Sequence, residues 1–252
     1  MNVQDLNNIA RAMVAPGKGI LAMDESTPTC NKRFENLGIE TTEEKRREYR
    51  DLLLAKPGLS EYIGGAILFD ETIRQKTLAG KPFPEHMQKI GIVPGIKVDT
   101  GAKDLAGHPG EKVTEGLDGL RERLAEYYGM GARFAKWRAV ITIGDGIPSR
   151  ACLQANAHAL ARYAALCQEA GIVPIVEPEV LMDGGHTIER CYEVTVETQN
   201  ILFNELYKQE VALEGIILKP SMVISGSTCP HRAGIQEVAE QTLRCLKNTV
   251  PV

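Results

Sequence analysis

Short apolar runs recur along the chain, and a longer segment separates each run from the next. The runs are bounded by glycine or proline and are too short for helices, which is typical of buried strands. The longer segments repeat apolar residues three and four positions apart, which is typical of amphipathic helices. This alternation predicts a parallel α/β sheet with right-handed crossovers. The predicted strands cover residues 19–24, 64–70, 92–99, 132–138, 172–179 and 214–219.

Helix-start and helix-stop signals lie between the predicted strands. Residues 41–44 match a capping box, in which Thr41 caps the first turn and Glu44 reaches back to it, and Pro57 ends that helix. No linker rich in serine, glycine or proline divides the chain, so we expect one domain over residues 1–252. The other predicted helices cover residues 3–13, 117–128, 149–171, 187–208 and the segment after Gly234.

Ionisable residues stand at the carboxyl ends of all six predicted strands. In a closed α/β barrel every strand end converges on one mouth, whereas an open doubly wound sheet binds ligands at one switch point. Charges on every strand therefore favour a TIM (β/α)8 barrel. No Gly-x-Gly-x-x-Gly motif follows a strand, so dinucleotide binding has no support. The strand-end residues are Asp24, Asp70, Lys97, Asp99, Lys136, Arg138, Glu177, Glu179 and Lys219.

The number of strands does not match a whole barrel. A barrel of this class has eight strands, and the sequence accounts for about six βα units. The chain stops at Val252, where a seventh strand is expected to begin. We therefore expect a barrel that is incomplete at its carboxyl terminus, with low turnover by the chain as printed.

Composition narrows the possible partners. The net charge is -4, which disfavours nucleic acid as a partner. No apolar run approaches the roughly 18 residues that cross a membrane, and the amino terminus lacks a signal-peptide layout. We expect a cytoplasmic protein, or a plastid stromal one whose transit peptide has been removed. The six cysteines form no Cys-x-x-Cys pair and the five histidines show no ligand spacing, so we expect buried, reduced cysteines and no metal site.

Lysines at several strand ends indicate amine catalysis. Taken alone, Lys219 would be interpreted as a strand-end lysine with its ammonium group in water. Neighbouring cations such as Lys97 and Lys136, together with partial desolvation, would lower its pKa toward neutrality. A neutral amine attacks a ketone and forms an iminium ion, which allows a carbon–carbon bond to break. The acids expected to transfer protons are Glu177, Glu179 and Asp24.

Five segments, in this order, resemble class I fructose-bisphosphate aldolases, most closely the plastid and cyanobacterial branch. The resemblance implies a lyase of glycolysis, gluconeogenesis or the Calvin cycle that cleaves fructose 1,6-bisphosphate reversibly to dihydroxyacetone phosphate and glyceraldehyde 3-phosphate. It implies a covalent imine without metal or other cofactor, a sugar phosphate as partner, and a homotetramer or dimer. The segments cover residues 19–26, 93–99, 132–138, 173–179 and 214–222.

The resemblance also implies a role for each matching residue. Lys219 falls on the Schiff-base lysine, Glu177 on the general acid/base and Glu179 on its neighbour. Asp24 falls on the acid that engages the C4 hydroxyl, with Lys136 as its cationic partner. The positions that bind substrate, largely through its phosphates, are Lys97, Arg138, Ser26, Arg33 and Arg46.

Several interpretations stay open from the sequence. Asp70, Asp99 and Glu179 are either ion-pair partners or site residues. Trp137 alternates away from Lys136, toward the core. One alternative function is another imine-forming barrel enzyme, similar to transaldolase, that acts on a different sugar phosphate. The other is a non-catalytic scaffold that keeps the surface of such an enzyme.

Overall fold

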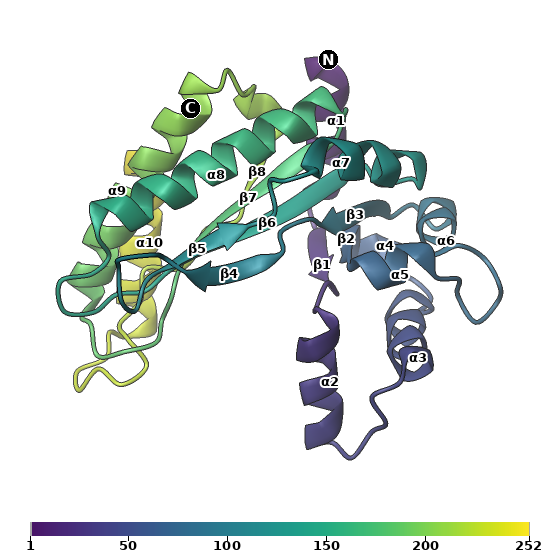
Figure 1. Ribbon diagram of the computed structural model, residues 1–252, viewed down its shortest axis with the longest axis horizontal. Helices are drawn as coiled ribbons and strands as arrows, with labels where there is room; N and C mark the ends of the chain where they lie inside the picture. The colour runs from purple at the N-terminus through teal and green to yellow at the C-terminus, as the bar shows by residue number, and fades with distance from the viewer. Residues whose placement is uncertain (1, 252) are drawn as a thin grey trace.

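The computed structural model describes residues 2–251 and is built around a parallel sheet (Figure 1). Its strand order is β1-β2-β3-β6-β7-β8, with β1 and β8 at the two edges, and every neighbouring pair is parallel. These six strands belong to the α/β, TIM-barrel class predicted from the sequence. They are β1 (Gly19–Ala22), β2 (Ile63–Leu68), β3 (Val93–Lys97), β6 (Phe134–Ile141), β7 (Val173–Val180) and β8 (Ile217–Leu218).

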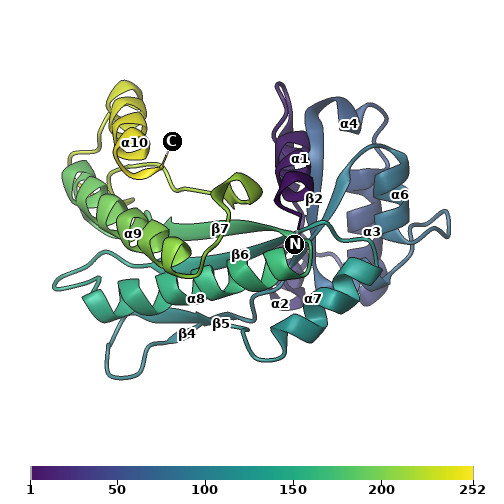
Figure 2. The same ribbon diagram turned by 90° about the horizontal axis from the view of Figure 1, so that it is seen from above.

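Helices connect successive strands and cover the outer face of the sheet. Figure 2 shows α8 lying along β6 and β7, with α9 beside α8 and α10 beside α9, and these pairs are in contact. No helix within residues 2–251 is long and apolar enough to cross a membrane. The helices are α1 (Val3–Met13), α2 (Thr27–Asn36), α3 (Glu43–Leu54), α4 (Leu59–Tyr62), α5 (Asp70–Arg74), α6 (Phe83–Lys89), α7 (Leu120–Gly129), α8 (Arg150–Glu169), α9 (Ile188–Lys208), the 3-10 turn η1 (Leu213–Gly215) and α10 (Ile235–Thr249).

The outward face of β6 forms the core with α8. Trp137 is fully buried, and its ring centroid lies 5.5 Å from that of Tyr163 on α8. The Tyr163 hydroxyl donates to the Ile175 carbonyl at 3.2 Å, so the one polar atom of this ring is satisfied. The prediction that Trp137 belongs to the core is confirmed.

The inward face changes from apolar to charged along the strands. At the amino-terminal end, Phe134 and Ile175 share a buried cluster with Leu6 and Met13 of α1. A Cβ atom at Gly95 would lie 2.2 Å from the Phe134 ring, so this position needs glycine to make room for the ring. Because α1 fills this end with apolar side chains, polar chemistry is confined to the carboxyl end.

The structure differs from the sequence prediction in two local features. An antiparallel hairpin of β4 (Gly101–Asp104) and β5 (Lys112–Glu115) follows β3, where no strand was predicted. The buried Asn156 of α8 holds it, accepting from the Thr114 N–H at 3.1 Å and donating to the Lys112 carbonyl at 2.8 Å. In addition, α3 is capped by Thr42, whose side chain accepts from the Lys45 N–H, so the prediction of Thr41 as the cap was wrong by one residue.

All six cysteines are buried and unpaired, as the sequence predicted. Burial raises the pKa of the Cys167 thiol, which therefore stays protonated at neutral pH. Burial also raises the pKa of the Cys30, Cys152 and Cys245 thiols, which makes them less reactive. Chemistry at the strand ends therefore depends on lysines and carboxylates.

Candidate active site

Four charged side chains from β1, β6, β7 and β8 meet at the carboxyl end of the sheet, and we call them the strand-end cluster. Lys136 Nζ on β6 lies 3.0 Å from Asp24 Oδ2 after β1 and 3.3 Å from Glu177 Oε2 on β7. The other oxygen of Glu177, Oε1, accepts from Nζ of Lys219, which follows β8. The carboxylate of Glu177 therefore lies between two amines from the strands on either side of β7.

Burial makes Lys136 the electrostatic centre of this cluster. The side chain of Lys136 is 10% exposed, that of Asp24 9% and that of Glu177 4%. Burial alone would lower the pKa of Lys136, but the charges of Asp24 and Glu177 more than offset burial, so its pKa lies above the ordinary value. Lys136 is thus a buried cation that compensates two buried carboxylates.

Lys219 is much more open than the sequence predicted. Its strand, β8, has only two residues and lies at the sheet edge, and the Lys219 side chain is 48% exposed. The prediction that residues 214–219 form a buried strand is therefore wrong for the described chain, because both residues of β8 are only partly buried. The Lys219 amine contacts a nearly buried carboxylate and also faces solvent.

A second row of charges lies beside the cluster. Arg138 Nη1 donates to Glu179 Oε2 at 2.8 Å, and both side chains are partly exposed. Lys97 on β3 is opposite Lys136 in the ladder and lies 3.2 Å from Asp99 Oδ1. The other oxygen of Asp99 accepts from the Arg138 backbone N–H at 3.3 Å. Asp99 is therefore an ion-pair partner of Lys97 that also contacts the backbone of β6.

The remaining predicted phosphate ligands belong to a separate group, the arginine cluster of Glu25, Arg33, Arg46, Arg50 and Glu71. Arg46 is buried and donates to both oxygens of Glu71, at 2.8 and 2.7 Å. Arg33 and Arg50 both donate to Glu25. Ser26 precedes α2, and its hydroxyl lies 3.1 Å from that of Thr29. The structure brings none of Arg33, Arg46 and Ser26 into contact with the strand-end cluster.

Asp70 is an ion-pair partner on the outside of the sheet. It begins α5, and its Oδ1 accepts from the Tyr127 hydroxyl at 2.8 Å and from Arg74 Nε at 3.0 Å. Burial would raise its pKa, but these hydrogen bonds and the Arg74 charge hold the pKa below the ordinary value. Of the two alternatives that the sequence left open for Asp70, this geometry favours the structural one.

A cavity of about 420 Å³ adjoins the strand-end cluster. Lys219, Glu177, Glu179 and Arg138 line it, and the loops after β7 and β8 contribute Asp183 and Ser221. Sequence reasoning missed the last two. Ser221 directly follows the Lys-Pro pair, so its position in the chain was the available signal.

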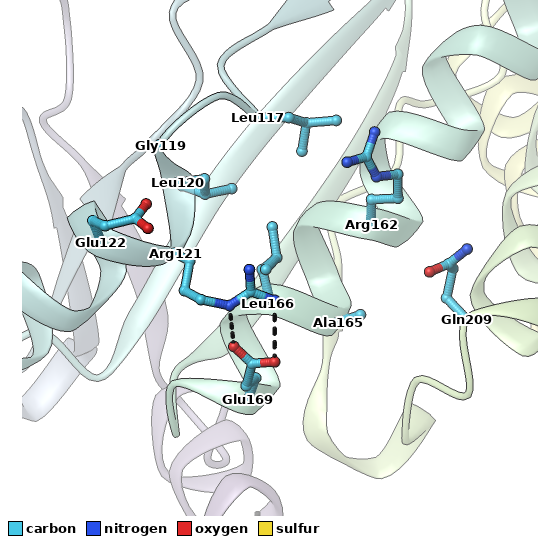
Figure 3. Close-up of a pocket in the computed structure, with 10 residues that line it drawn as sticks. All are labelled: Leu117, Gly119, Leu120, Arg121, Glu122, Arg162, Ala165, Leu166, Glu169 and Gln209. Atoms are coloured by element: carbon cyan, nitrogen blue, oxygen red, sulfur yellow. Dashed lines mark hydrogen bonds and ion pairs between the residues drawn. The ribbon is translucent and has the colours of Figure 1, made fainter.

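A second cavity, of about 430 Å³, lies between α7 and α8 (Figure 3). Its apolar wall includes Leu117, Leu120 and Leu166, and its edge carries an ion pair in which Arg121 Nε donates to Glu169 at 2.6 Å. None of the predicted site residues lines it. Within residues 2–251 there is no group of three or more histidine, cysteine, aspartate or glutamate side chains that could hold a metal ion.

Comparisons with known proteins show the family of this chain. The family model for class-I fructose-bisphosphate aldolase matches residues 5–252. A probable fructose-bisphosphate aldolase class 1 from Xanthomonas campestris pv. campestris is 67% identical over 251 residues, which cover 100% of this chain and 75% of the relative. Fructose-bisphosphate aldolase 1, chloroplastic, from Chlamydomonas reinhardtii is 52% identical over 98% of this chain and 66% of that protein.

A solved structure has the same fold. Fructose-bisphosphate aldolase from Plasmodium falciparum, in a ternary complex with TRAP and a small-molecule inhibitor, aligns with a TM-score of 0.97 and 48% sequence identity. The alignment covers 99% of this chain and 72% of that chain.

Proposed function

The chain belongs to the class I fructose-bisphosphate aldolases, lyases that cleave fructose bisphosphate reversibly, and we propose that Lys219 is the amine that bonds to the substrate. The observation that carries this assignment is the Glu177 carboxylate, which contacts Lys219 through one oxygen and Lys136 through the other. An amine beside a buried acid can exchange protons during attack on a ketone. Lys136, committed to two carboxylates, is not available for that attack.

In the first step Lys219 Nζ, as the free amine, attacks the C2 carbonyl carbon of the substrate. The nitrogen loses a proton as the carbonyl oxygen gains one, and a carbinolamine forms. Glu177, in its acid form, then protonates the departing hydroxyl, and water leaves as the iminium forms. Glu177 is well placed for this role because its Oε1 already contacts Nζ and its side chain is shielded from water.

In the second step Asp24 takes the proton from the C4 hydroxyl. The C3–C4 bond breaks, its electron pair moves to C3, and the iminium accepts the charge as an enamine. Glyceraldehyde 3-phosphate leaves as the aldehyde, and protonation of C3 followed by hydrolysis releases dihydroxyacetone phosphate. Lys136 Nζ lies 3.0 Å from Asp24 Oδ2 and holds this carboxylate in place for the proton transfer.

Among the candidate phosphate ligands, we propose that Arg138 and Lys97 are the main ones that bind the substrate phosphates. Arg138 lines the cavity and its side chain is 47% exposed, so a phosphate can replace Glu179 as its partner. Arg46, in contrast, would have to give up Glu71, Asn31 and the Thr41 carbonyl. Arg33 and Ser26 are proposed only as outer contacts of the bound substrate.

The proposed route uses no metal and no other cofactor, because the iminium accepts the electrons of the broken bond. Class I membership implies this route. We also propose a homo-oligomer, and a location in the cytoplasm or the plastid stroma. The algal relative is named as chloroplastic. Sedimentation of the purified chain would measure the oligomeric state, and a monomer at all concentrations would contradict that part of the proposal.

The test of the amine is reductive trapping. Dihydroxyacetone phosphate and sodium borohydride are added to the protein, and the modified peptide is sequenced by mass spectrometry. A stable adduct on Lys219 is expected, with Lys136 and Lys97 unmodified. Labelling of Lys136 in place of Lys219, or no adduct at all, would overturn the assignment.

A further inference from the structure

The hydrogen-bond ladder between β7 and β8 is interrupted beside the imine-forming lysine. The Lys219 N–H donates to the Val176 carbonyl at 2.9 Å. In a parallel ladder with this register, the next bond would run from the N–H of residue 178 to the Lys219 carbonyl. Residue 178 is a proline, which has no N–H. Within residues 2–251 the Lys219 carbonyl receives no bond from β7, so the ladder ends at this residue.

Ser221 restores the attachment two residues later. Its Oγ accepts from the Val180 N–H at 3.0 Å, in place of a backbone carbonyl. Val180 is 4% exposed, so loss of this acceptor would leave a donor with little access to water. The bonds at Val176 and Val180 thus lie on either side of Glu177, and together they hold the segment that bears Lys219 against β7.

Lys219 depends on this attachment because packing does not hold its side chain. The side chain is 48% exposed, and Glu177 is its one polar partner among residues 2–251. The path of the backbone through Pro220 and Ser221 therefore decides where Nζ lies. We propose that Ser221 is a positioning residue for the aldolase reaction, whose hydroxyl fixes this path and directs Lys219 Nζ to Glu177. The inference rests on the proposed role of Lys219.

The experiment measures the rate of borohydride trapping at Lys219 against dihydroxyacetone phosphate concentration. Ser221→Ala is expected to lower the saturating rate about 10- to 100-fold, because a displacement of the order of 1 Å has this cost. The concentration for half-saturation should change little, since Arg138 and Lys97 are untouched. Ser221→Thr keeps a hydroxyl and should recover most of the rate. A threonine variant as slow as alanine would overturn the role of the hydroxyl.

A serine in the same loop provides the matched control. Ser225 is 1% exposed, and its Oγ accepts from the Ala233 N–H at 3.0 Å, so it holds the loop to itself and not to β7. Ser225→Ala should lower the melting temperature without slowing trapping. Equal slowing in Ser225→Ala and Ser221→Ala would mean that loop stability alone matters, and would overturn the inference.

The outcomes separate the inference from the proposed function. If the unaltered chain takes no label on Lys219, the proposed function fails. If it is labelled and Ser221→Ala is labelled as fast, the inference fails. Should Ser221→Ala not fold, Ser221→Cys is compared with Ser221→Thr, because sulfur is a weaker acceptor than a hydroxyl oxygen. Equal trapping rates in those two variants would overturn the inference.

Discussion

The strand-end cluster and the arginine cluster carry similar charges but satisfy them differently. In the arginine cluster, Arg50 is 2% exposed and donates to both the side chain and the carbonyl of Glu25, and Arg46 has three acceptors. In the strand-end cluster, one buried lysine serves two carboxylates and a second lysine is half exposed. The two clusters therefore differ in exposure and in position, since only the strand-end cluster has a half-exposed amine and adjoins the cavity.

The largest expected effect comes from removing the half-exposed amine. Lys219→Met should lower turnover by at least about 10³-fold, because under the proposed mechanism the imine forms on this amine. The free energy of unfolding should change by less than about 0.5 kcal/mol, as for other partly exposed positions. Lys208→Met, which alters an exposed lysine on α9, is the matched control and should leave both values unchanged. Residual turnover near that of the control would contradict the proposed role of Lys219 in the mechanism.

Removing the shared cation should damage the fold as well as the chemistry. Lys136→Met leaves Asp24 buried without its cation and Glu177 with Lys219 alone, and the free energy of unfolding should fall by about 3–5 kcal/mol. Lys97→Met breaks only the pair with Asp99 and should cost clearly less. Urea titrations of both variants make the comparison. A loss from Lys136→Met no greater than that from Lys97→Met would contradict the role of Lys136 as shared cation.

A matched change in the arginine cluster should affect stability alone. Arg50→Met removes a buried charged hydrogen-bond donor and should lower the free energy of unfolding by about 2 kcal/mol. The rate of borohydride trapping at Lys219, measured below the unfolding transition, should equal that of the unaltered chain. Slower trapping in this variant would show that the arginine cluster also affects the reaction at Lys219, and would contradict the distinction between the two clusters.

The smallest expected effect is a difference in pH dependence. Burial would raise the pKa of Glu25, but Arg50 and Arg33 bring it below 4.5, so this carboxylate stabilises the fold above pH 4.5 and loses that contribution in acid. The stability difference between the unaltered chain and Arg50→Met should therefore shrink as pH falls below 4.5. The contribution of Lys136 to stability has the opposite pH dependence. Because its pKa in the fold is raised, the charged amine stabilises the fold below pH 10.5, and this contribution is lost only at higher pH. Urea titrations at several pH values test both signs.

Sequence reasoning predicted the strand-end residues because a parallel sheet brings all its strand ends to one edge. Asp24, Lys136, Glu177 and Lys219 each follow or end an apolar run, so the pattern alone marks them. It overstated the burial of Lys219, since apolarity of the preceding residues does not show whether a strand lies at an edge. The role of each residue came from the family resemblance.

Other features depend on partners far along the chain. The hairpin of β4 and β5 has little apolar alternation and is held by Asn156, 42 residues beyond Thr114. The family resemblance predicted Arg46 as a phosphate ligand, and spacing along the chain could not show its ion pair with Glu71, which lies 25 positions away. Two adjacent threonines, Thr41 and Thr42, offer nearly equal caps, and only the three-dimensional path distinguishes them.

The ion pair between Asp24 and Lys136 joins residues 112 positions apart, and Lys219 arrives 42 positions after Glu177. A ribosome must therefore synthesise residues 24–219 before the amine proposed to react has its acid beside it. A nascent polypeptide would carry its lysines through synthesis without capturing sugars from the surrounding metabolite pool. Under the proposed mechanism, adduct formation at position 219 would then report that β8 is seated against β7.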